Sequence, residues 1–165
     1  MALATSLACL LAVAGGKASQ DFEQGPRTFC DDTLSRTGFL PSGRGSQYFY
    51  WLADTRRNSS APLILWMTGG PGCSSILAML SENGPCLVGK GNASEKWQMT
   101  WNPWSWTEAG TVLWVDQPGE VGFSVGAESD DELEVSERML FFMLAFYERY
   151  PALLEAPLLL ERMRV

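Results

Sequence analysis

Two short, uninterrupted apolar runs constrain the fold more than any other feature of this sequence. Leu63–Met67 (LILWM) ends at a glycine-rich stretch, and Thr111–Asp116 (TVLWVD) ends at the turn sequence QPG. Continuous apolar runs of this length, bounded by turn residues, are typical of strands buried on both faces of a sheet. A third strand is predicted over Gln47–Leu52, which is rich in aromatic residues.

Helices are predicted between and after these strands. Glu132–Arg149 carries apolar residues at helical spacing, with Asp130 and Asp131 as candidate N-terminal caps and Pro151 as its stop. A short helix is expected over Ser75–Leu80. Because strands alternate with helices, the sequence predicts an α/β fold.

Three other segments are expected to be irregular. Phe39–Arg44 has the composition of a turn, and Gly89–Thr100 that of a polar surface loop. Trp97–Trp106 holds four tryptophans, which suit either ligand binding or ordinary packing. We favour packing, because large aromatic side chains serve mostly in burial.

Composition excludes several functions for the 165-residue chain. Its apolar content of 46% argues against disorder, and its net charge of −7 argues against a nucleic-acid partner. The sequence has no histidine, the usual general base and the commonest metal ligand. We therefore expect no metal and no cofactor.

The N-terminal sequence has features of a secretory signal. Leu3–Ala14 is an apolar run followed by small residues suited to cleavage near Ala18, so residues 1–19 are expected to be a signal peptide. A signal anchor or a core helix is the alternative, although this run and all later ones are too short to span a bilayer. Asn58 and Asn92 begin glycosylation acceptor tripeptides, which are meaningful only in a secreted chain.

The glycine-rich stretch Thr68–Gly72 (TGGPG) lies between a predicted strand and a predicted helix. Glycines there let the backbone approach a ligand, and free N–H groups suit an anion or a developing oxyanion. The spacing matches neither a P-loop nor a dinucleotide-binding loop. From the residues alone, a ligand-free tight turn explains the stretch equally well.

The motifs TGGPGCSS, SENGPC and WNPWSWTEAGTVLWVDQPGEVGFSVG occur in this order at compatible distances. Together they resemble the N-terminal part of the serine carboxypeptidases, secreted or lysosomal α/β-hydrolases that release C-terminal residues from peptides. The resemblance covers roughly Thr37 to Leu158. It implies residues 20–165 as a partial α/β-hydrolase domain, and a location in the vacuole, the lysosome or outside the cell.

The resemblance also assigns roles to the glycine loop and to Glu82. It implies that the Gly70 backbone N–H contributes to the oxyanion hole, and that Gly69 and Thr68 hold the C-terminal carboxylate of a peptide substrate. Thr68 departs from the commoner asparagine but keeps a hydroxyl donor. Glu82 is expected in the same pocket, where one of two facing carboxyl groups stays protonated and donates a hydrogen bond. The alternative is an exposed helix acid with no role.

The family's hydrolytic machinery has no counterpart in these residues. No G-E-S-Y-A-G or similar elbow follows the Glu132–Arg149 helix and no histidine occurs, while Asp116 and the GFSVG sequence at residues 122–126 belong to the family's DQP…GFS segment. We expect a serine carboxypeptidase fragment that is inactive alone. The alternatives are a secreted module that binds peptide C-termini without cleaving them, and a truncated product with no function.

Two structural expectations follow from the resemblance. The cysteine of the glycine motif pairs far downstream in the family, which leaves Cys73 unpaired and allows Cys30 and Cys86 to pair. The strand after the Glu132–Arg149 helix is expected to be missing, because residues from Leu160 on do not resemble the family. Leu63–Met67 would then be an open sheet edge, the helix residues Phe142, Met143 and Phe146 would be partly exposed, and the chain would be prone to aggregate.

Overall fold

A computed structural model describes residues 30–57, 60–69, 72–90, 96–129 and 131–162 of the chain. Its strands are β1 (Ser35–Pro41), β2 (Gln47–Ala53), β3 (Leu63–Met67), β4 (Cys86–Lys90), β5 (Trp97–Trp101), β6 (Thr111–Val115) and β7 (Leu158–Arg162). Its α-helices are α2 (Ser75–Ala78) and α3 (Glu132–Arg149). A π-helical turn (Met79–Asn83) directly follows α2, and 3₁₀ turns cover Trp106–Glu108 and Pro151–Leu153.

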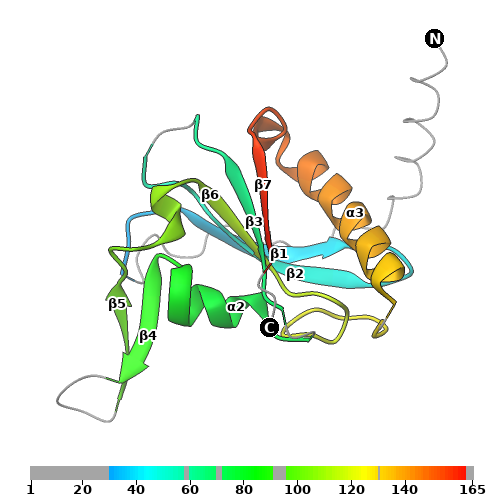
Figure 1. Ribbon diagram of the computed structural model, residues 1–165, viewed down its shortest axis with the longest axis horizontal. Helices are drawn as coiled ribbons and strands as arrows, with labels where there is room; N and C mark the ends of the chain where they lie inside the picture. Colours follow the sequence, from blue (N-terminus) through cyan, green and yellow to red (C-terminus); the bar gives the residue numbers. More distant parts are fainter. Residues whose placement is uncertain (1–29, 58–59, 70–71, 91–95, 130, 163–165) are drawn as a thin grey trace.

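A five-stranded mixed sheet forms the centre of the molecule, in the order β1-β2-β6-β3-β7 (Figure 1). β1, β2 and β6 pair antiparallel, whereas β3 runs parallel to both β6 and β7. Helix α3 packs on one face, and α2 lies on the other. The predicted α/β class is confirmed, as are the predicted bounds of β3 and α3.

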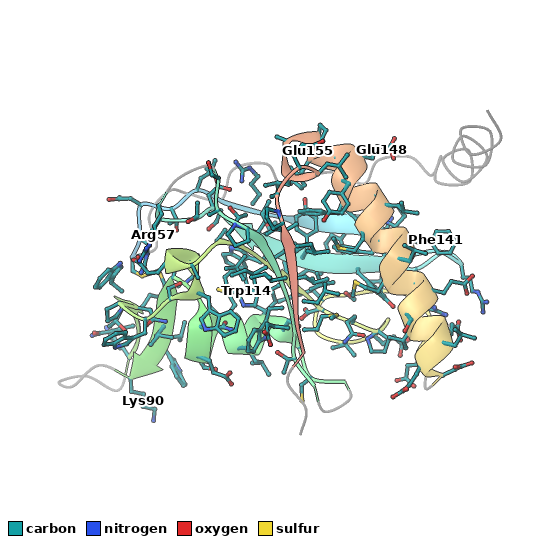
Figure 2. The ribbon with its side chains drawn as sticks, turned by 45° about the horizontal axis from the view of Figure 1, so that its top comes forward. Arg57, Lys90, Trp114, Phe141, Glu148 and Glu155 are labelled. Carbon is teal, nitrogen blue, oxygen red and sulfur yellow. A yellow bond between two sulfur atoms is a disulfide. The ribbon has the colours of Figure 1, made fainter. Side chains whose placement is uncertain are left out.

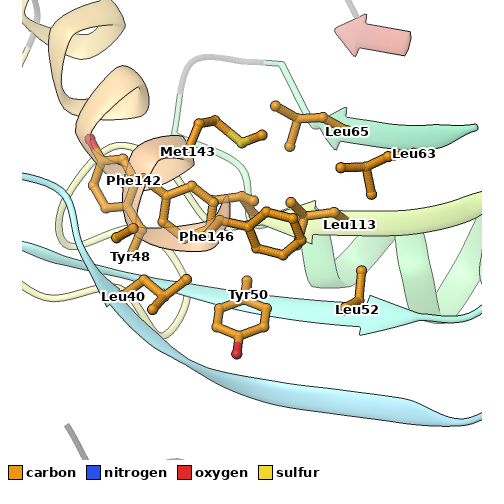
Figure 3. Packing of buried hydrophobic residues seen from close by; sticks show 12 residues of the cluster. Leu40, Tyr48, Tyr50, Leu52, Leu63, Leu65, Leu113, Phe142, Met143 and Phe146 are labelled. Carbon is orange, nitrogen blue, oxygen red and sulfur yellow. The ribbon is translucent and has the colours of Figure 1, made fainter. Parts of the chain in front are cut away.

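The alternation of side chains along the central strands builds two cores. On the α3 side, Leu63 and Leu65 of β3 pack with Phe142 and Phe146 of α3, together with Tyr50 of β2 (Figure 3). The other face holds a second cluster that α2 covers, made of Ala53, Ile64, Trp66, Ile76, Ala78, Met79, Val112 and Trp114. β3 and β6 are thus buried on both faces, as their continuous apolar sequences predict.

Helix α3 is positioned by one buried arginine. Arg138 is 3% exposed and binds Glu134 one turn earlier, with 2.6 Å between the nearest nitrogen and oxygen. It also donates to the Ser46 hydroxyl and to the Ala127 carbonyl, each at 2.8 Å. At the start of the helix, the Asp131 carboxylate accepts the Leu133 N–H at 2.9 Å, which is an N-cap. These polar contacts join α3 to the β1–β2 turn and to the loop after β6.

The expectation that β3 forms an open edge of the sheet is wrong. β7 pairs with the whole of β3, from Leu63 opposite Leu158 to Met67 opposite Arg162. The three helix residues expected to be partly exposed are also buried, with Phe142 and Phe146 at 0% and Met143 at 8% exposure. The C-terminal leucines form a strand that the sequence analysis expected to be missing, and β7 is the outermost described strand on this side of the sheet.

Local structure corrects three further expectations. Phe39–Pro41 belongs to β1, so the predicted turn begins only at Ser42. The segment predicted as a polar loop contributes to a hairpin, because β4 and β5 pair antiparallel on both sides of it. Three of the four tryptophans are exposed rather than packed, at 70% for Trp97, 54% for Trp101 and 85% for Trp104. Figure 2 shows Lys90 at the outer end of this hairpin, far from α3.

Candidate functional site

The loop after β3 is held by hydrogen bonds from three directions. The Trp66 indole N–H donates to the Thr68 hydroxyl at 3.1 Å, and the Thr68 N–H donates to the Ser75 hydroxyl at 3.0 Å. Ser75 in turn donates to the Val115 carbonyl at 2.6 Å, at the end of β6. No described residue accepts the Thr68 hydroxyl proton, which is therefore available to a ligand. Gly70, the expected oxyanion donor, lies outside the described residues.

Asp116 fixes the geometry on the far side of this loop. Its side chain is fully buried and accepts the Ser74 hydroxyl at 2.7 Å and the Phe123 N–H at 3.0 Å. Ser74 also accepts the Ile76 N–H and so caps α2. The carboxylate of Asp116 therefore connects the start of α2 to the loop after β6.

Glu82 lies in the π-helical turn after α2, and its side chain is exposed. Within the described residues, the Glu82 carboxyl group has no hydrogen-bond or ion-pair partner. The structure records no contact between Glu82 and Thr68 or Gly69, so a shared pocket stays a prediction. A free carboxyl group at this position is compatible with both a ligand contact and an exposed acid without a role.

The backbone around Glu82 is fixed by buried residues that sequence reasoning did not single out. Asn102, which is 1% exposed, donates to the carbonyls of Glu82 at 3.2 Å and of Gly84 at 2.9 Å. The Trp114 indole N–H donates to the Asn83 side-chain oxygen at 2.9 Å. Figure 2 shows Trp114 in the interior, close to α2. The sequence feature that could have identified these residues is the joint presence of ENGP, WNP and VLWVDQP, the three motifs in which they lie.

Gly84 explains why this turn needs glycine. A Cβ atom there would lie 2.0 Å from the Met79 carbonyl oxygen, closer than any real contact allows. The π-helical turn therefore ends against residue 84 with no room for a side chain. Together with Asn102, this contact defines the path of the chain just after Glu82.

Arg56 anchors the same turn from outside. Its side chain is 10% exposed and forms a short ion pair with Asp31. It also donates to the Asn102 carbonyl at 2.8 Å and to the Pro85 carbonyl at 3.2 Å. The Trp101 ring lies 4.8 Å from the guanidinium carbon. The Arg56 side chain thus joins the N-terminal segment to the two motifs that carry Glu82 and Asn102.

The surroundings of Asp31 shift the pKa of its carboxyl group. Burial alone raises the pKa of Asp31, but hydrogen bonds from the Thr33 N–H and from Arg56 favour the carboxylate more strongly and lower the pKa below its ordinary value of 3.8. A lowered folded-state pKa contributes stability that is fully present above the ordinary value. That contribution is lost as the pH falls through the folded-state pKa.

We expect Asp31→Asn to lower the free energy of unfolding by about 3 kcal/mol near neutral pH, because it removes the nearer and more buried of the two carboxylates that pair with Arg56 and leaves only Glu108, at 3.4 Å. The difference from the wild type should shrink as the pH falls below 3.8. Urea unfolding at several pH values measures both effects. Asp32→Asn, at the exposed neighbouring position, is the control and should change stability by less than about 0.5 kcal/mol. A pH-independent loss in Asp31→Asn would contradict the assignment.

A disulfide joins Cys30 to Cys86, with 5.9 Å between their Cα atoms. Cys86 immediately follows the ENGP motif, so the bond and the Arg56–Asp31 ion pair hold the same turn. The Cys73 thiol is free and exposed, in the loop before α2. This is the arrangement that the family resemblance implied.

An open surface pocket of about 450 Å³ is lined by Cys30, Asp31, Asp32, Arg56 and Trp101. None of these residues was expected to contact substrate, and Thr68, Gly69 and Glu82 are not among them. The glycosylation acceptors Asn58 and Asn92 and the expected signal peptide, residues 1–19, lie outside the described residues.

Comparison with known proteins decides the family. The family model described as serine carboxypeptidase matches residues 26–161. The chain belongs to the serine carboxypeptidase family. Among its relatives, serine carboxypeptidase-like 49 of Arabidopsis thaliana is 36% identical over 129 residues, which cover 74% of this chain and 24% of that protein. A serine carboxypeptidase of the same family from Dictyostelium discoideum is 39% identical over 133 residues, covering 76% of this chain and 31% of that protein.

Structure comparison agrees with the sequence match. A crystal structure of a prohormone-processing carboxypeptidase from Saccharomyces cerevisiae aligns with a TM-score of 0.65 and 27% identity, covering 79% of this chain and 31% of that chain. The chain therefore has part of the α/β-hydrolase fold of this family. It spans about a quarter to a third of the length of these carboxypeptidases. In the part of the chain that the structure describes, no helix is long and apolar enough to cross a membrane.

Proposed function

We propose that this chain forms the part of a serine carboxypeptidase that binds the C-terminal carboxylate of a peptide substrate. The observation that carries the proposal is the loop at the end of β3. Its threonine is oriented by Trp66 and Ser75 and keeps its hydroxyl proton unused among the described residues. The family match over residues 26–161 supports the same conclusion.

Three groups would hold the carboxylate in this proposal. The Thr68 hydroxyl and the Gly69 N–H donate hydrogen bonds to the two carboxylate oxygens. Glu82 supplies the third contact, with one proton shared between its carboxyl group and the substrate carboxylate. The Gly70 N–H would serve the oxyanion of the scissile carbonyl.

Hydrolysis needs a nucleophile and a general base in addition to this site. The 165 residues contain no histidine, and the serine of their one G-x-S-x-G match, Gly122–Gly126 (GFSVG), is buried and donates its hydroxyl proton to the Asp116 carbonyl at 2.7 Å. We therefore propose that these residues bind peptides with a free C-terminal carboxylate and do not cleave them alone. The proposal needs no metal, cofactor or nucleic acid.

The proposal places the protein in the secretory pathway and on to the vacuole, the lysosome or the outside of the cell. A signal peptide over residues 1–19, followed by a carboxypeptidase segment over residues 20–165, would deliver it there. The Cys30–Cys86 disulfide supports this location, because disulfides persist mainly in oxidising compartments. Glycans on Asn58 and Asn92 would follow from the same route.

Replacing Glu82 with glutamine tests the site. We expect Glu82→Gln to weaken binding of an N-acetylated dipeptide about tenfold at acidic pH, because the strong hydrogen bond that shares one proton between two carboxyl groups is replaced by a weaker one from a neutral amide N–H. The same peptide with a C-terminal amide should bind both proteins equally weakly. Isothermal titration calorimetry across pH 4–7 measures the affinities.

Glu148→Gln is the matched control for this experiment. Glu148 is also exposed and helical, but it lies on α3, at a distance from the β3 loop in Figure 2. It should leave both affinities unchanged. Equal losses for the free acid and the amide in Glu82→Gln would show that Glu82 has only a structural effect.

A further inference from the structure

The carboxylate site of the proposed function has two halves that lie on different segments. Thr68 and Gly69 follow β3, and Glu82 lies in the π-helical turn after α2. No hydrogen bond or ion pair within the described residues joins these halves directly. A carboxylate contacts both halves at once only when their spacing is right, so whatever fixes that spacing determines how well the ligand binds.

One segment between β5 and β6 holds the Glu82 half. Residues 102–106 (NPWSW), the NPWSW turn, donate hydrogen bonds to all three carbonyls of residues 82–84. Asn102 binds the first and the third, at 3.2 and 2.9 Å. Ser105, which is 2% exposed, donates to the carbonyl between them at 3.2 Å. The backbone that carries the Glu82 side chain therefore has a fixed position relative to this turn.

The same turn contacts the Thr68 half through an aromatic pair. The Trp106 ring lies edge-to-face against the Trp66 ring, with 4.8 Å between the centroids and an interplanar angle of 84°. Trp66 is 7% exposed, and its indole N–H is the donor to the Thr68 hydroxyl at 3.1 Å. Trp106 therefore limits rotation of the indole that holds the hydroxyl oxygen, and so directs the unused Thr68 proton.

Two adjacent indoles connect the halves inside the core on the α2 side. Trp66 of β3 and Trp114 of β6 lie opposite each other, and both belong to the cluster against which Trp106 packs. The Trp66 N–H binds Thr68, whereas the Trp114 N–H binds the Asn83 side chain of the other half at 2.9 Å. The two halves are thus linked through buried rings that pack beside one turn.

We propose that the NPWSW turn is the positioning element of the carboxylate site, in which Trp106 positions the Thr68 half and Ser105 positions the Glu82 half. This role rests on the proposed function, and it explains how a site built on two segments selects a free carboxylate over an amide. Neither side chain needs to touch the ligand. Each raises the fraction of molecules in which both halves are correctly spaced, and the apparent dissociation constant rises as that fraction falls.

Titration with an N-acetylated dipeptide and with its C-terminal amide tests the two roles. Trp106→Leu should weaken binding of the free acid about fivefold at every pH from about 4 to 7, because the Thr68 half acts at all these pH values. Ser105→Ala should weaken it about fivefold only at the acidic end, where Glu82 shares its proton. The affinity for the amide should stay unchanged in both variants, which a general loss of structure would not allow.

Three further variants complete the titration. Trp106→Phe keeps an aromatic ring against Trp66 and should stay within about twofold of the wild type. Trp106→Met fills the space with a flexible apolar chain and replaces Trp106→Leu if that variant does not fold. Trp104→Leu removes the neighbouring tryptophan, which is 85% exposed, and should change neither affinity. Equal losses in Trp104→Leu and Trp106→Leu would overturn the role of Trp106.

Exchange of the indole N–H protons, followed by NMR spectroscopy without ligand, tests the positioning separately. Trp106→Leu should speed exchange at Trp66 at least about tenfold and leave Trp114 within about twofold, because its ring contact is with Trp66. Ser105→Ala should give the opposite pattern, because it releases the backbone of Asn83, the acceptor of the Trp114 N–H. Trp66→Phe and Trp114→Phe identify the two signals.

The two measurements separate this role from the function on which it rests. Unchanged exchange in both Trp106→Leu and Ser105→Ala, or an acid preference that both variants retain, would overturn the positioning role and leave the proposed function intact. A wild type without an acid preference would instead refute the proposed function. The exchange rates would then still decide whether the turn positions Thr68 and the backbone at Glu82.

Discussion

Truncating Phe146 to alanine is expected to lower the free energy of unfolding by about 3–5 kcal/mol. The Phe146 ring is fully buried between α3 and the sheet. Its centroid lies 6.2 Å from that of Tyr50 and 5.0 Å from that of Tyr150, and Figure 3 shows it among Leu113 and Met143. Removing it leaves a cavity that these neighbours cannot fill without leaving their packed positions.

Urea unfolding followed by circular dichroism measures this loss. The expected effect is a large part of the roughly 5–15 kcal/mol that stabilises a typical domain. Leu140→Ala, on the same helix but 58% exposed, is the control and should change stability by no more than about 0.5 kcal/mol. Equal small effects for the two variants would mean that α3 does not pack on the sheet in solution.

The second large effect is expected from Gly122→Ala. Gly122 has a φ of +58°, and a Cβ atom there would lie 2.0 Å from an Asp116 carboxylate oxygen and 2.8 Å from the Ser74 hydroxyl. Asp116 is buried and cannot move without losing its hydrogen bonds to Ser74 and Phe123. We expect destabilisation of at least about 3 kcal/mol, because hydrogen bonds to a buried charge are lost along with the backbone preference.

Gly45→Ala separates the two causes of that loss. Gly45 also has a positive φ, +78°, but a Cβ atom there meets nothing within 4 Å. Gly45→Ala should lower the free energy of unfolding only by the cost of a positive φ for alanine, about 1–2 kcal/mol. Thermal unfolding of both variants gives the difference, and similar losses at the two positions would contradict the close packing of Asp116 against residue 122.

The elements that sequence predicted best are those whose patterns have one structural interpretation. LILWM and TVLWV are too short and too apolar for surface helices, and both are buried strands of the sheet. The 18 residues of α3 show sustained helical spacing with an aspartate cap, and both of its bounds were predicted. In these segments local propensity and burial agree.

Pairing between distant segments was beyond the same reasoning. Leu158–Leu160 is a run of three leucines with no periodicity, and only its alignment with β3 makes it a strand. The four tryptophans of Trp97–Trp106 were expected to pack, yet Trp97 and Trp101 are exposed on the β4–β5 hairpin, which projects from the body (Figure 1), and Trp104 is exposed just after it. The strand at Leu158–Leu160 and the exposure of the tryptophans are both decided by which distant segments pack against these residues, and local sequence does not reveal those segments.

The candidate site, like the fold, was only partly predictable from the sequence. The motifs located Thr68, Gly69 and Glu82, but the residues that position them came from the structure. Trp66 orients Thr68, while Asn102 fixes the backbone at Glu82. These contacts join segments that are separated by up to 20 residues, and they depend on buried donors whose partners a linear sequence does not reveal.

Titration of the purified chain with an N-acetylated dipeptide and with its C-terminal amide tests the central claim most directly. If Thr68, Gly69 and Glu82 bind a peptide carboxylate, the free acid should bind at least about tenfold more tightly than the amide at acidic pH. The preference should decline as the pH rises and the shared proton is lost, and mass spectrometry should find the recovered peptide intact. Equal affinity for the acid and the amide at every pH, or release of the C-terminal residue, would contradict the account.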